Sequence, residues 1–401
     1  MKITMVIPTY WGRKKAEGWK EGDAIYDHPT PLDEQGTLKR AIESINILEN
    51  KNFNLAIIAA ATAPDIEEQV EKKVREIVSS VNTGVKTEVF SHSDLRKIHD
   101  FFKLNSMPEY NELLKLRGYS NIRNLCLFIP HMQDSDISIL IDDDEIFEDP
   151  KFMDKAGEFI GKKFENNIIH GIAGYYIQEE NDFLVNKELK PYMVYWDKFD
   201  KMNKGFKEII GSEPRVKKTP FVFGGNMVID KHLFKKIPFD PFVTRGEDID
   251  YLMNAKMFGY QFYLDNKLSI KHLPPPKPHP TWRRVREDIY RFMYEREKIR
   301  AQKKTEGMIK VSAEDFDPYP GEFLKDNLEE KIIKTSEILA LEYLSENKPE
   351  DAKESLNNML IDPETLNFED PFSNYLKIQE KWEKMMNIIE KDNLKEKINN
   401  L

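Results

Sequence analysis

Apolar runs alternate with amphipathic stretches through the first part of the chain, and this alternation predicts strands and helices in turn. Four apolar runs have the length of buried strands, at residues 2–10, 53–62, 85–91 and 137–142. Helical spacing of apolar positions follows between them, at residues 36–50, 64–81, 93–104 and 118–133. Strands that alternate with helices imply a parallel sheet covered on both faces, so we expect an α/β fold.

The pattern becomes mixed after residue 151. Apolar runs at 168–178 and 260–273 read as strands, and 246–259 reads as a helix that ends at Gly259. A stiff proline-rich stretch follows at 273–280, and beyond it the chain is charged and helical in pattern. We therefore predict one α/β domain over 1–280, with halves of about 1–150 and 151–280, and a helical region over 281–401.

Composition narrows the classes of protein. The chain has 401 residues and a net charge of -10, which argues against a general nucleic-acid binder. A single cysteine, Cys126, excludes a disulfide framework or a cysteine-rich zinc site. We expect no signal peptide and no membrane span, and hence a cytoplasmic protein. The C-terminal helices offer a surface for association with a second copy.

An acidic cluster follows the strand at 137–142. Asp142, Asp143, Asp144 and Glu145 are consecutive, although close carboxylates repel one another. A solvated turn would explain them, since aspartate is common in turns. A divalent-metal site would explain them equally well, because carboxylate oxygens suit Mg²⁺ or Mn²⁺. Asp142 and Asp144 have the spacing that places two side chains on the same side of an extended segment.

Several other motifs accompany the cluster in a fixed order along the chain. They are Ile7-Pro8-Thr9-Tyr10 at the end of the first strand, Arg123-Asn124, Gly224-Gly225-Asn226, Glu247-Asp248 at a predicted helix start, and His272 at a strand end. Three of them have an ordinary explanation: a turn for the glycines, a favourable helix N-terminus for the acidic pair, and a packed or surface position for the histidine.

Taken together, these motifs over residues 1 to 280 resemble those of the GT-A nucleotide-sugar glycosyltransferases, family 2-like. The resemblance implies a Rossmann-like, mostly parallel sheet with helices on both faces, and a divalent cation (Mn²⁺ or Mg²⁺) that holds a nucleotide-diphosphate sugar. It implies metal ligands at Asp142, Asp144 and His272, and a catalytic base at Asp248 beside Glu247. The donor would contact Pro8, Thr9, Tyr10, Arg123, Asp142, Asp143, Gly224, Gly225 and Asn226.

The resemblance implies transfer of a sugar to the hydroxyl of a small-molecule or glycan acceptor. An inverting mechanism with Asp248 as base is the first hypothesis. The second is a retaining transferase for a small anionic acceptor such as glycerate or phosphoglycerate, which would suit the basic residues Lys277, Arg283, Arg284 and Arg286. Those arginines could equally form a solvated helix face. A hypothesis of another class is a non-catalytic helical scaffold with a degenerate GT-A domain.

Two features depart from the family pattern. The second strand ends in "AAATAPD" rather than in an early aspartate, so Ser91, His92 and Asp94 are alternative contacts for the nucleotide base. The polar segment 11–35 is long for a loop in a compact domain, and such loops are usually functional or mobile.

Overall fold

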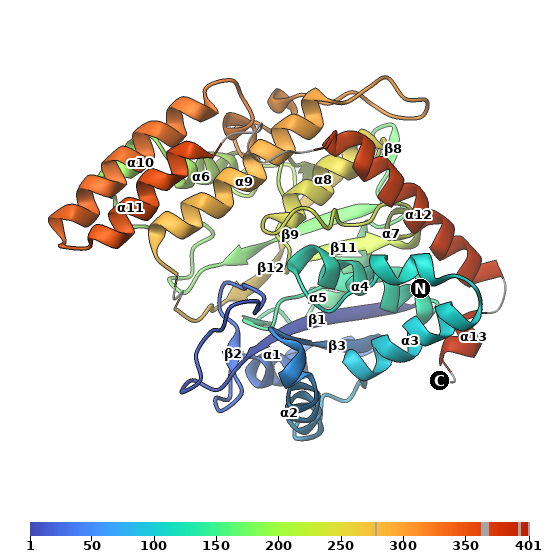
Figure 1. Ribbon diagram of the computed structural model, residues 1–401. Coiled ribbons are helices and arrows are strands. Elements are labelled where there is room, and N and C mark those ends of the chain that lie inside the picture. The colour runs from blue at the N-terminus through green and yellow to red at the C-terminus, as the bar shows by residue number, and fades with distance from the viewer. Residues whose placement is uncertain (277–278, 362–368, 392–393, 400–401) are drawn as a thin grey trace.

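A single mixed sheet organises the fold of this computed structural model, which describes residues 1–276, 279–361, 369–391 and 394–399. Its main strand order is β10-β12-β9-β11-β5-β1-β3-β4, with β2 beside β1 and β6 beside β12 (Figure 1). The strands are β1 (Ile3–Gly12), β2 (Thr30–Pro31), β3 (Asn54–Ala61), β4 (Lys86–Phe90), β5 (Ile137–Leu140), β6 (Glu145–Ile146), β9 (Gly171–Ile177), β10 (Val216–Lys218), β11 (Met227–Asp230) and β12 (Phe262–His272). A separate hairpin joins β7 (Lys163–Phe164) to β8 (Asn167–Ile168).

Most of the long strand pairs are parallel. β1 runs parallel to β3 and β5, β3 to β4, and β9 to β12. β11 is antiparallel to both β5 and β9, so the residues before β11 lie at the edge where β5 ends. This reversal brings the Gly224-Gly225 segment to the carboxyl ends of the parallel strands, where open α/β sheets bind their ligands.

Helices cover both faces of the sheet. The α-helices are α1 (Leu38–Ser44), α2 (Glu67–Ser79), α3 (His92–Leu104), α4 (Tyr119–Met132), α5 (Phe152–Glu158), α6 (Lys198–Ile209), α7 (Lys231–Lys236), α8 (Glu247–Met257), α9 (Thr281–Arg300), α10 (Leu328–Ser345), α11 (Pro349–Asn357), α12 (Pro371–Lys391) and α13 (Leu394–Asn399). Ser91 and Asp94 form a capping box at the start of α3, which explains why that helix begins where it does. None of the described helices is long and apolar enough to cross a membrane.

Alternation along β1 divides the core into two clusters. Met5, Ile7 and Trp11 face the cluster that includes residues of α1 and α2, whereas Val6 and Tyr10 face the cluster that includes residues of α3, α4 and α8. The fold class expected from the sequence is confirmed: a mostly parallel sheet lies between helices and is followed by further helices.

The C-terminal helices continue the second cluster instead of forming a core of their own. Trp382 of α12 is fully buried, and its indole N–H donates to the Phe234 carbonyl of α7 at 3.0 Å. Residues of α9, α10 and α12 belong to the same buried cluster as residues of β1 and β5. Figure 1 shows α9 passing beside α8, with α10 and α11 grouped near α6. The segment after residue 280 therefore packs directly around the sheet domain.

Candidate functional site

The motif residues meet at the edge where β1, β5 and β12 end. Asp142 to Asp144 follow β5, Thr9 and Tyr10 lie near the end of β1, and His272 is the last residue of β12. β6 holds this arrangement, because Glu145 is paired with His272 in an antiparallel bridge. The sequence placed these side chains on separate strands, and the sheet brings them to one point.

The acidic cluster is largely buried. Asp143, Asp144 and Glu145 are between 1% and 5% exposed, whereas Asp142 is partly accessible. The Asp142 backbone N–H donates to Glu145 Oε2 at 2.9 Å, and Thr9 Oγ1 donates to Asp143 Oδ2 at 2.6 Å. Burial and the neighbouring charge of Asp144 raise the pKa of Asp143 to about 7. Burial, with Asp142 and Asp144 close by, also raises the pKa of Glu145 well above its usual range.

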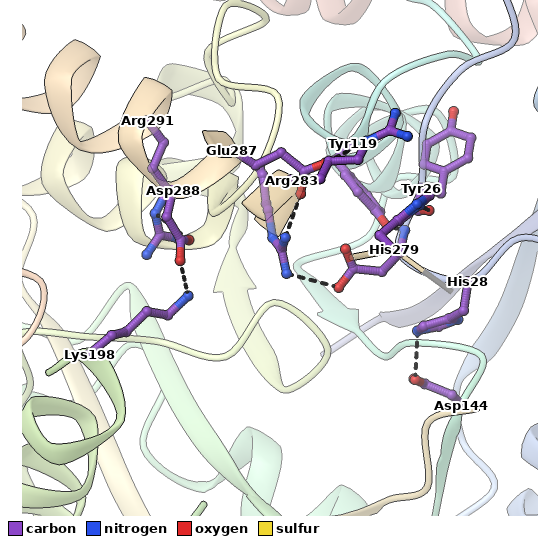
Figure 2. A network of polar contacts seen from close by, with 12 residues as sticks. Tyr26, His28, Tyr119, Asp144, Lys198, His279, Arg283, Glu287, Asp288 and Arg291 are labelled. Atoms are coloured by element: carbon purple, nitrogen blue, oxygen red, sulfur yellow. Dashed lines mark hydrogen bonds and ion pairs between the residues drawn. The ribbon is translucent and has the colours of Figure 1, made fainter. Parts of the chain in front are cut away.

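Two histidines converge on one carboxylate oxygen. His28 Nε2 lies 3.2 Å and His272 Nε2 lies 3.3 Å from Asp144 Oδ2 (Figure 2 shows the His28 contact). Burial alone would raise the pKa of Asp144, but the hydrogen bonds from both imidazoles hold that pKa well below its ordinary value. The two imidazoles therefore favour the ionised form of Asp144.

Arg123 joins the acidic cluster to the Glu247-Asp248 motif. This buried side chain of α4 places Nη2 2.8 Å from Asp142 Oδ1 and Nε 3.1 Å from Glu247 Oε1. Burial raises the pKa of Glu247 to about 6 although Arg123 opposes the shift. One guanidinium thus pairs with two carboxylates, the partly accessible Asp142 and the buried Glu247.

Asp248 lies in the first turn of α8 and is held by backbone donors. Its Oδ2 accepts from the Gly224 N–H at 3.0 Å, and its Oδ1 accepts from the Ile249 N–H at 2.9 Å. Burial raises the pKa of Asp248, while Arg291 and these N–H groups oppose the shift. The carboxylate is fixed in position and faces a cavity, as a general base requires.

Glycine is required at 225 by a close approach of side chains. A Cβ there would lie 2.0 Å from Glu145 Oε1, far inside van der Waals contact. Gly224 is similarly close to Arg123, whose Nη2 would be 2.8 Å from an added Cβ. Asn226 is completely buried, and its amide donates to the carbonyls of Tyr175 and Leu268. Gly225 and Asn226 therefore support the site through their packing and hydrogen bonds, without lining the cavities beside it.

Two cavities open beside these residues and share part of their lining. The smaller cavity, of about 190 Å³, is lined by Tyr10, Arg123, the three aspartates 142 to 144, Gly224 and Glu247 among others. The larger cavity, of about 560 Å³, is lined by residues of α6, α8 and α9. Both are lined by Tyr176, Arg245, Asp248, His272 and Pro274. Four of the predicted donor contacts, Pro8, Thr9, Gly225 and Asn226, line neither cavity, so any contact of these four with a ligand stays a prediction.

The segment 11–35 supplies functional candidates that the sequence motifs missed. Figure 2 shows Tyr26 and His28 of this segment beside residues of α9, and His279 Nε2 lies 3.1 Å from the Tyr26 carbonyl. Arg245 bridges the same segment to α9, with Nη2 3.1 Å from Asp27 and Nη1 2.5 Å from Glu287. The only signal for His28 in the sequence was its place in an unusually long polar segment.

The three residues predicted as alternative contacts for the nucleotide base, Ser91, His92 and Asp94, lie away from the acidic cluster. Ser91 and Asp94 are engaged in the α3 capping box, and His92 Nδ1 lies 3.2 Å from Glu71 on a surface hollow next to α2. None of the three lines either of the two cavities at the acidic cluster.

The basic residues around the start of α9 differ in their surroundings. Arg283 lies 3.8 Å from Glu287, and Arg286 lies 2.9 Å from Glu354. Arg284 lines the larger cavity. Lys277, the fourth member of the predicted basic group, lies outside the described residues.

The donor set at the acidic cluster fits a hard divalent cation. Carboxylate oxygens of Asp142, Asp144 and Glu145 all lie within 4.8 Å of one another. Glu145 Oε1 is buried and has no hydrogen-bond partner among the described residues, which is costly unless a cation or proton is nearby. Carboxylates next to the imidazole of His272 suit Mn²⁺ or Mg²⁺, and the nitrogen ligand favours Mn²⁺.

Comparison with known proteins gives matches only among solved structures. No family model and no curated protein matches the sequence. The chain is similar to a mannosyltransferase from Pyrobaculum calidifontis solved with GDP-Man and Mn²⁺, at 13% identity and a TM-score of 0.46, over 97% of this chain and 88% of that one. It is also similar to glucosyl-3-phosphoglycerate synthase from Mycobacterium tuberculosis with Mg²⁺ and UDP, at 15% identity and a TM-score of 0.34, over 69% and 72%.

A third match is GalNAc-T7 solved with UDP, GalNAc and Mn²⁺, at 13% identity and a TM-score of 0.36, over 82% of this chain and 57% of that one. Each of these likenesses is one of chain fold alone.

Proposed function

We propose that this chain is a metal-dependent glycosyltransferase that moves a sugar from a nucleotide-diphosphate sugar to an acceptor hydroxyl. One observation carries the proposal: an acidic cluster that fits a divalent cation and a positioned carboxylate, Asp248, line one continuous pair of cavities. Sugar transfer needs both, because one group must stabilise the leaving diphosphate and another must accept the acceptor's proton.

Each residue has a role in this proposal. Asp142, Asp144 and His272 would hold the cation, and Glu145 would support them from behind. The bound cation supplies Lewis-acid stabilisation of the negative charge that builds on the leaving diphosphate. Arg123 pairs with both Asp142 and Glu247 and fixes their orientation.

Asp248 would accept the proton of the attacking hydroxyl, which becomes a better nucleophile as its O–H bond weakens. Its two backbone hydrogen bonds leave further lone pairs of the carboxylate free for this contact. A single displacement with this base inverts the configuration at the anomeric carbon. Proton NMR of the first product formed tests this point, and a retained configuration would assign Asp248 to positioning the acceptor.

Thermal denaturation with and without ligands tests the proposal as a whole. Mn²⁺ together with GDP or UDP should raise the melting temperature, since a ligand that binds only the native state stabilises it by mass action. Asp144→Ala should remove the metal-dependent part of that rise. Glu148→Gln is the matched control, because Glu148 is an exposed acidic residue in the same segment.

Failure of every nucleoside diphosphate to stabilise the chain with Mn²⁺ would favour the scaffold hypothesis. An equal rise in melting temperature for Asp144→Ala and the wild-type chain would remove Asp144 from the proposed cation site.

A further inference from the structure

The larger cavity adjoins Asp248 and so receives the acceptor, if the proposed function holds. Its volume of about 560 Å³ lies within the range of small-molecule sites and exceeds the needs of a three-carbon acid. α6 and the loop before it form one wall, α9 forms another, and Asp248 and His272 lie where this cavity meets the smaller one.

The walls of this cavity are mainly apolar. Met193, Trp196, Phe199, Met202, Phe206 and Val285 are among the residues that line it. A glycan or polyol acceptor presents several hydroxyl groups, each of which needs a hydrogen-bonding partner once it leaves water. The neutral polar side chains of the lining are Gln178, Thr281, Tyr176, Tyr192 and Tyr319. The hydroxyls of Tyr176 and Tyr319 already accept from Gly225 and Arg291, so an apolar body suits this lining better.

Most cations of the lining already have a carboxylate partner. Lys198 Nζ lies 2.6 Å from Asp288 Oδ2, and Arg291 Nε lies 3.7 Å from Asp288 Oδ1 (Figure 2). Arg245 is paired with Asp27 and Glu287. Each of these three cations thus has a carboxylate partner inside the protein, and Lys198 and Arg291 share the carboxylate of Asp288.

Arg284 differs from them. Its Nη2 donates to Thr281 Oγ1 at 3.0 Å, but among the described residues no carboxylate lies within 4.0 Å of its guanidinium. Its Nε is buried and has no hydrogen-bond partner there. It belongs to the first turn of α9, where the helix dipole also favours an anion. A half-buried arginine with unused donors is a ready partner for a carboxylate or phosphate.

We propose that the acceptor of this cavity is amphipathic: a hydroxyl-bearing molecule with an apolar body and one anionic group that pairs with Arg284. The apolar body lies against Trp196, Phe199 and Met202, and the hydroxyl reaches Asp248. The inference rests on the proposed function and assigns the acceptor class for the same site.

Binding of simple probes to the full chain tests the inference. Calorimetric titration would compare 2-hydroxydecanoate, which has all three features, with glycerate, which lacks the apolar body, and 1,2-decanediol, which lacks the anion. We expect 2-hydroxydecanoate to bind at least tenfold more tightly than either. Titration with 3-phenyllactate distinguishes an aromatic body from an alkyl one. If 3-phenyllactate binds more tightly than 2-hydroxydecanoate, the apolar body of the acceptor is aromatic; if it binds more weakly, the body is an alkyl chain.

Variants separate charge from packing. Arg284→Gln should lower the affinity for 2-hydroxydecanoate at least tenfold. The affinity of this variant for 1,2-decanediol should stay within about twofold of the wild-type value. Phe199→Ala should lower the affinity for both of these probes. Arg300→Gln is the matched control, because Arg300 lies on the same helix and is paired with Glu297 and Asp326 outside the cavity. Thermal denaturation of each variant verifies that it is folded.

Glycerate binding as tight as that of 2-hydroxydecanoate would overturn the inference, and so would an equal loss of charged and neutral probes in Arg284→Gln. Nucleotide and Mn²⁺ binding is measured separately, on the same samples, by thermal shift. Loss of that response contradicts the proposed function, whereas weak probe binding with an intact response contradicts only the acceptor class.

Discussion

The backbone N–H of Gly224 donates a 3.0 Å hydrogen bond to Oδ2 of Asp248, which ties the segment before β11 to the start of α8. This contact fixes the proposed base between the two cavities. Asp248→Asn keeps the size of the side chain but removes its ability to take a proton. We expect transfer to fall by about two to four orders of magnitude, the usual range for a lost general base, in a steady-state assay of sugar transfer.

Nucleotide and Mn²⁺ affinity should survive in Asp248→Asn, because the cation ligands are unchanged. Asp250→Asn is an unsuitable control, since Asp250 is buried and paired with Lys298. Asp200→Asn on α6 is exposed and outside both cavities, and it should transfer sugar at the wild-type rate. A wild-type rate in Asp248→Asn would remove Asp248 from the base role.

Gly225→Ala should weaken the cation site without a change of charge. The new Cβ would occupy the space of the Glu145 carboxylate, which must move away from Asp142. We expect Mn²⁺ affinity to fall at least tenfold, measured by titration calorimetry. Gly12→Ala provides the comparison, because its Cβ would meet Pro29 at an ordinary 3.7 Å. Equal Mn²⁺ affinity in the two variants would mean that Glu145 has no influence on the ion.

His131 predicts a loss of stability in acid. Its ring is fully buried, its Nε2 lies 2.9 Å from the Met386 carbonyl of α12, and burial lowers its pKa to about 3. Below the ordinary pKa of about 6.5, the unfolded chain binds a proton that the folded chain does not. The contribution of neutral His131 to the free energy of unfolding is therefore complete above pH 6.5 and is lost as the pH falls. At pH 5 the loss is about 2 kcal/mol.

Urea denaturation at pH 7 and pH 5 measures this loss. His131→Gln cannot titrate, so its unfolding free energy should fall less between the two pH values than that of the wild type. An identical fall in both chains would assign the acid sensitivity to other groups.

Arg245→Ala should release the N-terminal segment from α9. The variant loses the contacts to Asp27 and Glu287, which join the two walls of the site. We expect tryptic cleavage at Lys14, Lys15 or Lys20 to be about tenfold faster, which corresponds to about 1.4 kcal/mol of opening free energy. Arg75→Ala breaks only the pairs with Glu71 and Asp94, which do not involve the N-terminal segment, and should leave the cleavage rate unchanged. Unchanged cleavage in Arg245→Ala would show that other contacts hold the segment.

Periodicity and caps were sufficient to predict most of the individual elements. The expected strands at 2–10 and 137–142 became β1 and β5, and the helix expected at 246–259 became α8. Local patterns carry such information because a strand or helix is amphipathic over its own length. The antiparallel direction of β11 was beyond them, since strand direction depends on distant partners.

The site could be predicted from the sequence where its functional groups lie on consecutive residues. Adjacent carboxylates in the sequence identified two parts of the site, Asp142 to Asp144 and Glu247-Asp248. His28 did not, because its contact with Asp144 spans more than a hundred residues of sequence and depends on how a polar segment folds back. Arg284 was one of several basic residues in the sequence, and only the three-dimensional pairing of Arg283 and Arg286 sets it apart.

The position of α9 in the larger cavity has a consequence for biosynthesis. Every strand of the sheet precedes α9 along the chain, so the acidic cluster and its histidines emerge from the ribosome before the wall that carries Arg284. α12, which packs on α7 and α9, emerges later still. In the proposed function, the residues that would hold the cation are therefore synthesised before the wall that would hold the acceptor.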